Sequence, residues 1–166
     1  MEDVRVRATR WSGVGKPWEG PVITSFVIAP DVIVDLIMAN GQAGAEAALL
    51  FDAIAADREA GRGHRRAYVA GITIPTIAYL AGTSAGPTYA RGILVDLLRL
   101  VTVVQMNNTD YLEAVSYRSV HYDEALQFVA CRAVGAKYLV TRNDYGLKRM
   151  PVKHRTAGEM MPLFRD

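Results

Sequence analysis

Residues 122–143, YDEALQFVACRAVGAKYLVTRN, predict a helix, a turn and a strand in close succession. Apolar side chains recur at helical spacing, at Tyr122, Leu126, Val129 and Ala133. Such a stripe is typical of a helix that packs one face on a core, and Gly135 is a natural place for this helix to end. Residues 137–141 (KYLVT) then predict a strand, and the polar loop TRNDYGLKR follows it.

The rest of the chain alternates in the same way between short apolar runs and helical patterns. Further strands are predicted at residues 22–29, 67–73 and 101–106, and helices at residues 30–40 and 47–54, after Pro75, from Pro87 and after Asn108. Strands that alternate with helices indicate an α/β fold with a mostly parallel sheet. Ligands of such sheets bind at the carboxyl ends of the strands, so we expect a site at residues 29–31 and 141–146.

Residues 122–143 resemble the most recognisable stretch of PIN domains, in which an acid-Ala-Leu helix precedes a Gly-Ala turn, a strand and a Thr-Arg-Asn loop. The other elements agree in order, with FVIAPDVIVDLI early, TIAYL in the middle and a basic stretch near the end. The resemblance covers residues 22–162 and is to VapC-type toxins and related ribonucleases. It implies a PIN-like three-layer α/β fold over residues 22–166, with a mostly parallel central sheet flanked by helices, after an extension at residues 1–21.

The resemblance also implies a cluster of acids that holds one or two Mg²⁺ or Mn²⁺ ions for phosphodiester cleavage. A hard dication needs oxygen ligands, and it activates water while neutralising phosphate charge. The four acidic positions of the family fall on Ala29, Tyr79, Glu124 and Gly146, so one carboxylate is kept. Each carboxylate lost from about 4 Å removes roughly 8 kcal/mol of gross attraction to a dication at an effective dielectric near 20.

Nearby acids offer a rearranged set. Asp31 and Asp144 each stand two residues from an expected position, and Asp123 precedes Glu124. A shift of two residues is tolerable in a loop, whereas on a helix it turns the side chain by about 200°. Glu124, Asp144 and Asp31 would then be catalytic, with Glu124 and Asp144 on the metal, in an endoribonuclease dependent on Mg or Mn. Acids in a first helical turn are also explained as partners of the helix dipole.

The hypothesis that the residues favour is a degenerate PIN-like module without catalysis or cofactor, which binds RNA or a protein. Basic residues are enriched in the predicted glycine-rich loop at residues 61–66 (GRGHRR) and in residues 142–166, which contain six Lys and Arg and three Asp and Glu. Phosphate contacts need positive charge within reach, although a solvated charged face explains the same pattern. The predicted RNA-binding residues are Arg62, Arg65, Arg66, Arg142, Asn143, Lys148 and Arg149.

The composition bounds the remaining possibilities. The chain has 166 residues, which suits one domain, and a net charge of +2, which by itself does not indicate a nucleic-acid binder. The single Cys131 excludes a disulfide framework and cysteine-rich zinc sites. The longest apolar stretch, residues 26–38, is too interrupted to span a membrane, and the N-terminus does not read as a secretory signal. We therefore expect a cytoplasmic chain and, by family analogy alone, a homodimer with an antitoxin-like protein partner.

Overall fold

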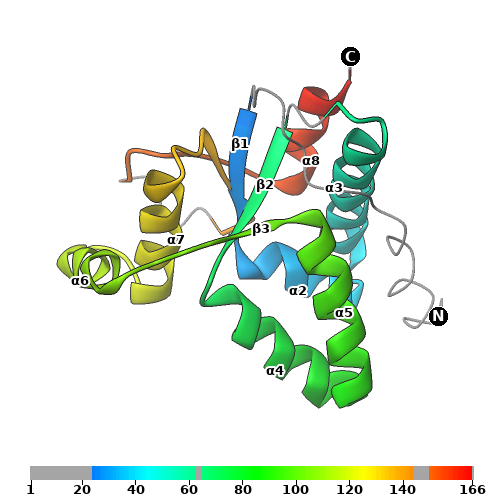
Figure 1. Ribbon diagram of the computed structural model, residues 1–166, viewed down its shortest axis with the longest axis horizontal. Coiled ribbons are helices and arrows are strands. Elements are labelled where there is room, and N and C mark those ends of the chain that lie inside the picture. The colour runs from blue at the N-terminus through cyan, green and yellow to red at the C-terminus, as the bar shows by residue number, and fades with distance from the viewer. Residues whose placement is uncertain (1–23, 63–64, 144–149, 166) are drawn as a thin grey trace.

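The computed structural model describes residues 24–62, 65–143 and 150–165. The strands form one sheet in which every neighbouring pair is parallel, in the order β3-β2-β1-β4-β5 (Figure 1). They are β1 (Thr24–Ile28), β2 (Arg65–Ala70), β3 (Thr102–Val104), β4 (Tyr138–Val140) and β5 (Lys153–Arg155). The predicted α/β fold with a parallel sheet is confirmed. The predicted extension at residues 1–21 lies outside the described residues.

Helices cover both faces of the sheet and give the fold three layers (Figure 1). They are α2 (Pro30–Met38), α3 (Gly41–Glu59), α4 (Thr73–Ala85), α5 (Pro87–Leu100), α6 (Asn108–Ser116), α7 (Tyr122–Ala133) and α8 (Ala157–Met160), followed by a 3₁₀ turn, Met161–Phe164. Successive strand residues point to opposite faces, so Phe26 and Ile28 pack with α2, α3 and α5, whereas Val27 and Ala29 pack with α6 and α7. Among the described helices, none is both long enough and apolar enough to cross a bilayer.

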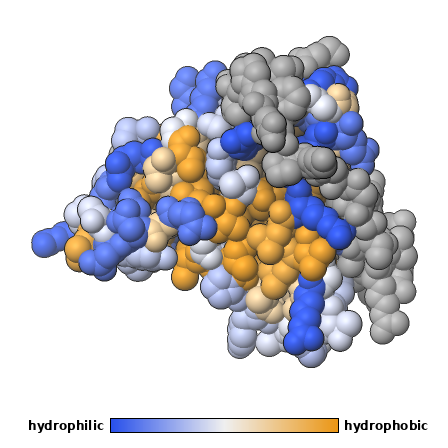
Figure 2. All heavy atoms as spheres, in the orientation of Figure 1, coloured by the Kyte–Doolittle hydropathy of each residue, from blue (hydrophilic) through white to orange (hydrophobic). Residues whose placement is uncertain are grey.

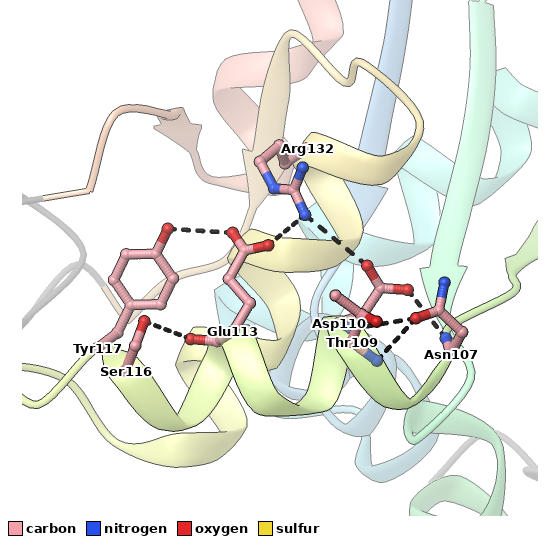
Figure 3. Close-up of polar contacts among 7 residues, drawn as sticks. All are labelled: Asn107, Thr109, Asp110, Glu113, Ser116, Tyr117 and Arg132. Atoms are coloured by element: carbon pink, nitrogen blue, oxygen red, sulfur yellow. Dashed lines mark hydrogen bonds and ion pairs between the residues drawn. The ribbon is translucent and has the colours of Figure 1, made fainter.

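A network of polar contacts fixes α6 against α7 (Figure 3). Arg132 of α7 forms an ion pair with Glu113 of α6 and a longer one with Asp110, at 3.7 Å. Glu113 also accepts a hydrogen bond from the Tyr117 hydroxyl at 3.2 Å. The Asn107 side chain caps the start of α6, and the Asn107 N–H in turn donates to Asp110 Oδ2 at 2.8 Å. Helix α7, which begins the stretch of sequence quoted first, therefore packs on the sheet and is also bound to α6.

Element boundaries differ from the predictions in three places. Strand β2 begins at Arg65, so the prediction that Arg65 and Arg66 lie in a loop is wrong. Strand β2 ends at Ala70 and α4 begins at Thr73, which places Pro75 in the first helical turn, where its missing N–H has no helical partner to lose. Strand β5 was not predicted, because its short basic sequence has no apolar run.

Apolar side chains stay exposed on the outer surfaces of α4 and α5. Tyr79 and Leu80 of α4 are 70% and 36% exposed, and Val95 and Leu98 of α5 are 48% and 46% exposed. Figure 2 shows an apolar area in the middle of one face, over the region that β3 and α5 occupy in Figure 1. Apolar areas rimmed by polar residues are typical of interaction surfaces.

Candidate functional site

A pocket opens at the carboxyl edge of the sheet, among the end of β1, the start of α7 and the segment after β4. Its volume is about 140 Å³. It is lined by Ala29, Pro30, Asp31, Asp123, Glu124, Gln127, Leu139, Thr141 and Asn143. The Ala29 N–H donates to the Val140 carbonyl at 2.9 Å, so the ends of β1 and β4 are tied together at this edge. The pocket lies where the parallel-sheet rule predicted a site.

Asp31 lies in the first turn of α2, and its carboxylate faces the segment after β4. The oxygen Oδ2 accepts hydrogen bonds from the Thr141 hydroxyl at 2.8 Å and from the Arg142 backbone N–H at 2.9 Å. The other oxygen, Oδ1, is buried and has no hydrogen-bond partner within the described part of the chain. Both donors are uncharged groups, which orient the carboxylate without forming an ion pair with it. With Asp35, whose effect is larger, the charge of Asp31 also helps to raise the pKa of Arg142.

Glu124 lies in the first turn of α7, and a chain of hydrogen bonds links it to Asp31. The Glu124 Oε1 accepts from the Asn143 side-chain amide at 3.0 Å, and its Oε2 accepts from the His121 N–H at 3.4 Å. The Asn143 backbone N–H donates to the Thr141 hydroxyl oxygen at 3.1 Å. Thr141 therefore contacts both Asp31 and the residue that holds Glu124.

Two of the three acids of the rearranged set, Asp31 and Glu124, line this one pocket. Asp123 lines it as well, and Asp144 lies outside the described residues. The apolar Ala29 stands at the end of β1. Within residues 24–62, 65–143 and 150–165, no three Asp, Glu, His or Cys side chains are placed to hold one metal ion. The described donor set therefore does not fit Mg²⁺ or Mn²⁺, which take several oxygen ligands.

Arg142, which was predicted to contact RNA, is bound to a buried carboxylate. Its Nε and Nη2 donate to Asp35 at 2.5 Å and 3.1 Å, and Asp35 is 2% exposed. Asp35 also accepts from the Asn40 side chain at 2.9 Å. The hydrogen bond and charge of Asp35 raise the pKa of Arg142. This ion pair anchors the segment that directs Asn143 into the pocket.

The other predicted RNA-binding residues lie elsewhere or are not described. Arg65 and Arg66 begin β2, at the amino edge of the sheet, and exposed Arg62 precedes them. The Arg65 Nη1 pairs with the buried Asp57 carboxylate at 2.8 Å. Because β2 and β4 both run parallel to β1, these residues and Arg142 lie at opposite ends of the sheet. Lys148 and Arg149 lie outside the described residues, and RNA binding stays a prediction.

Gln127 of α7 is a pocket residue that the sequence did not single out. It is 4% exposed, and neither Nε2 nor Oε1 has a hydrogen-bond partner in the described structure. The one available signal is its place four residues after Asp123, on the same side of a helix, among apolar neighbours. Cys131, one turn further on, is a core residue, and burial raises the pKa of its thiol to about 12.

Comparison with known proteins finds likeness in structure. No family model matches the sequence, and no curated protein matches it either. The fold matches a chain of VapBC2 from Rickettsia felis bound to a DNA fragment from their promoter, with TM-score 0.59 and 14% identity, over 80% of this chain and 98% of that one. VapBC-1 from nontypeable Haemophilus influenzae gives TM-score 0.60 and 14% identity, over 81% of this chain and 98% of that one. DNA-bound VapBC from Salmonella typhimurium gives TM-score 0.61 and 13% identity, over 81% of this chain and 98% of that one.

The fold is PIN-like. A parallel sheet with helices on both faces agrees with the fold class that the residues and their resemblance predicted. At 13–14% identity the likeness concerns the course of the chain. The chemistry of the pocket rests on the residues described above.

Proposed function

We propose that this chain is a PIN-like module of a toxin–antitoxin type of pair, and that it acts by binding a protein partner without cleaving RNA. The observation that carries the proposal is Ala29. It is 6% exposed at the end of β1 and presents a methyl group to the pocket. The resemblance to PIN domains places a metal-binding carboxylate at this position.

The charges of the pocket support a role without RNA cleavage. Three carboxylates line it, those of Asp31, Asp123 and Glu124, and no lysine, arginine or histidine among the described residues does so. Two like charges 4 Å apart repel by about 1 kcal/mol even in water, and by about 4 kcal/mol near a protein surface. Phosphate groups are therefore disfavoured in this pocket unless a dication is present.

An antitoxin-like protein is the partner that the fold favours, because the similar chains belong to complexes named VapBC. Tyr79 and Leu80 on α4 and Val95 and Leu98 on α5 expose apolar and aromatic surface. A protein partner buries surface of this kind at the centre of an interface. A homodimer is the further expectation, and light scattering of the purified chain tests it.

The test of the proposal is incubation of the chain with a mixed pool of single-stranded RNA and Mn²⁺. Parallel reactions contain a chelator, the variant Glu124→Gln and the matched control Glu59→Gln, which changes an exposed residue at the end of α3. We expect no cleavage above the chelator background. Cleavage that the chelator and Glu124→Gln abolish, and that Glu59→Gln preserves, would contradict the proposal.

A metal-dependent endoribonuclease is the second candidate, favoured by one observation. Asp31 and Glu124 line the same pocket, as an acidic centre requires. This candidate needs Asp144 to complete the set with Mg²⁺ or Mn²⁺. Loss of cleavage in Asp144→Asn as well as in Glu124→Gln is the result that would establish it.

A further inference from the structure

The pocket contains polar atoms whose hydrogen-bonding capacity the described residues leave unused. They are Nε2 and Oε1 of Gln127 and Oδ1 of Asp31, and all three are buried. Gln127 is 4% exposed and lines the pocket with Asp31. Buried polar groups in native proteins almost always have a partner, so a buried donor and two buried acceptors in one pocket point to a ligand.

The rest of the pocket limits the size and shape of that ligand. Ala29, Pro30 and Leu139 supply apolar walls. The volume of about 140 Å³ is several times the ~10–15 Å³ that one water needs, and smaller than the ~300 Å³ of drug-sized sites. Apolar walls with a few directed polar groups are typical of small-molecule sites. A flat ring edge suits this space.

We propose that the pocket binds the edge of a nucleobase that carries an exocyclic amino group beside an unprotonated ring nitrogen, as adenine and cytosine do. The amino group donates to Gln127 Oε1 and Asp31 Oδ1, and the ring nitrogen accepts from Gln127 Nε2. Glutamine pairs with an amino edge of adenine in this two-bonded way, and carboxylates accept from the amino group of cytosine. Rotation about the broad terminal torsion of Gln127 orients its amide toward the base.

The carboxylate of Asp31 makes the pocket selective. Inosine and uridine present a carbonyl oxygen where adenosine and cytidine present the amino group, and that oxygen would face Asp31 Oδ1, another acceptor. A guanidinium ion satisfies the two acceptors and leaves the Gln127 N–H group without one. Among the ligands compared, the amino base is the one that uses all three atoms. It needs neither a metal ion nor a protein partner, so this site goes beyond the proposed function.

Asp31 also offers a way to reverse the selectivity. Its Oδ2 already accepts from the Thr141 hydroxyl and the Arg142 N–H. In Asp31→Asn the amide oxygen therefore takes the place of Oδ2, and the NH₂ group takes the place of Oδ1. A donor then faces the ligand, so bases with a carbonyl group become the preferred ones.

The experiment is a titration of the full chain with adenosine, cytidine, inosine and uridine. Calorimetry measures the binding, and NMR monitors the signals of the glutamine side-chain amides. We expect adenosine and cytidine to bind at least about tenfold more tightly than inosine and uridine, and to shift the Gln127 signal. Gln127→Leu abolishes binding. The matched control Gln105→Leu, which changes an exposed glutamine after β3, leaves binding unchanged. Asp31→Asn inverts the order of the four nucleosides.

Several results would overturn the proposal: no nucleoside bound at millimolar concentration, equal binding of all four, or binding that survives Gln127→Leu. Competition by guanidinium as strong as that by unlabelled adenosine would do so too, since the pocket would then respond to charge alone. If circular dichroism shows that Gln127→Leu is unfolded, the inversion by Asp31→Asn decides, because that change is nearly isosteric.

A second series identifies the source of the base. Short RNA strands that contain one adenine or one inosine are titrated beside the free nucleosides. Tighter binding of the adenine strand than of adenosine assigns the site to a base within RNA, and weaker binding assigns it to a free nucleoside. The same binding of both strands, with no preference for adenine, overturns the proposal. No arm uses RNA cleavage or a protein partner, so failure here is distinct from failure of the proposed function.

Discussion

The amino end of the parallel sheet and the pocket at its carboxyl end hold their carboxylates in opposite ways. At the amino end, Asp57 is 5% exposed and accepts a 2.8 Å hydrogen bond from the cationic Arg65. The ring of Phe164 lies 5.4 Å from the same guanidinium. At the carboxyl end, Asp35 is likewise paired with Arg142. The pocket carboxylates Asp31 and Glu124, however, accept their hydrogen bonds from hydroxyl, amide and backbone groups, all uncharged.

This difference separates a structural edge from a candidate binding edge, the one that carries the pocket. An ion pair cancels its charges, whereas neutral donors orient a carboxylate and leave its charge available to a ligand. Buried oxygens without a hydrogen-bond partner in the described structure occur at both ends, at Asp57 and Asp96 as well as at Asp31. Those of Asp31 and Gln127, however, belong to residues that line one pocket, and such a group calls for a functional explanation. Changes at the amino edge are therefore expected to alter stability most, and changes at the carboxyl edge to alter binding.

Arg65→Met tests the amino edge and has the largest expected effect. It leaves the buried Asp57 carboxylate without its cation, at a cost of about 3–5 kcal/mol in the free energy of unfolding. Urea denaturation followed by circular dichroism measures this loss. The double variant Arg65→Met/Asp57→Leu removes both charges and recovers most of the stability, because apolar residues can replace a buried pair. If Arg65→Met is as stable as the wild type, the ion pair does not hold this edge.

Ala29→Asp tests the carboxyl edge by adding a fourth carboxylate to the three that line the pocket. A buried charge beside Asp31 and Glu124 is expected to cost roughly 3 kcal/mol of stability without metal. If the missing carboxylate is what prevents metal binding, millimolar Mn²⁺ restores part of this loss, since a ligand of the folded state stabilises it. Thermal unfolding with and without Mn²⁺ measures both effects.

The control for Ala29→Asp is Ala55→Asp in α3, because both alanines are 6% exposed. Ala55→Asp is expected to lose stability without recovery in Mn²⁺. The same response to Mn²⁺ in both variants would show that the pocket plays no part in it.

Sequence reasoning located the binding edge but missed some of its groups. The alternation of strands and helices predicted the parallel sheet, and the end of β1 directed attention to Asp31. Arg65 was misplaced because the glycines of GRGHRR favour a loop, and pairing with β1 overrides that local preference. Gln127 was missed because a lone glutamine in an apolar helix forms no pattern. Only the packing of α7 beside β1 and β4 gives that side chain a pocket to line.

Thr141→Val tests the link between the two carboxylates of the binding edge. The hydroxyl donates to Asp31 at 2.8 Å and accepts from the Asn143 N–H at 3.1 Å. Thr141 is 5% exposed, so solvent cannot replace the hydroxyl, and a loss of about 1–2 kcal/mol is expected. Thr141→Ser keeps the hydroxyl and is expected to lose less in the same urea titration. If Thr141→Val is as stable as the wild type while Thr141→Ser loses stability, the methyl group, and not the hydroxyl, stabilises this edge.

Asp96→Asn tests a second buried carboxylate at the amino edge, near the end of α5. Among the described residues Asp96, unlike Asp57, has no close ion pair with an arginine. Asp96 is 3% exposed, its Oδ2 has no hydrogen-bond partner in the described structure, and Arg99 stands 3.8 Å from its Oδ1. Burial raises the pKa of Asp96 above its usual 3.8, and the charge of Arg99 opposes this shift. The folded chain therefore binds the proton more tightly than the unfolded chain. The contribution of Asp96 to stability is fully present below the unfolded-state pKa and is lost as the pH rises through the folded-state pKa.

Asp96→Asn is accordingly expected to be more stable than the wild type at pH 7, by about 1 kcal/mol. The advantage should disappear as the pH falls toward about 3, where Asp96 is protonated in both states. Urea denaturation of both chains at the two pH values measures the difference. If the variant is less stable at pH 7, attraction to Arg99 outweighs the cost of burial. Charge pairing would then hold for both acids compared at this end, Asp57 and Asp96, and the contrast with the neutral donors around Asp31 and Glu124 would be sharper.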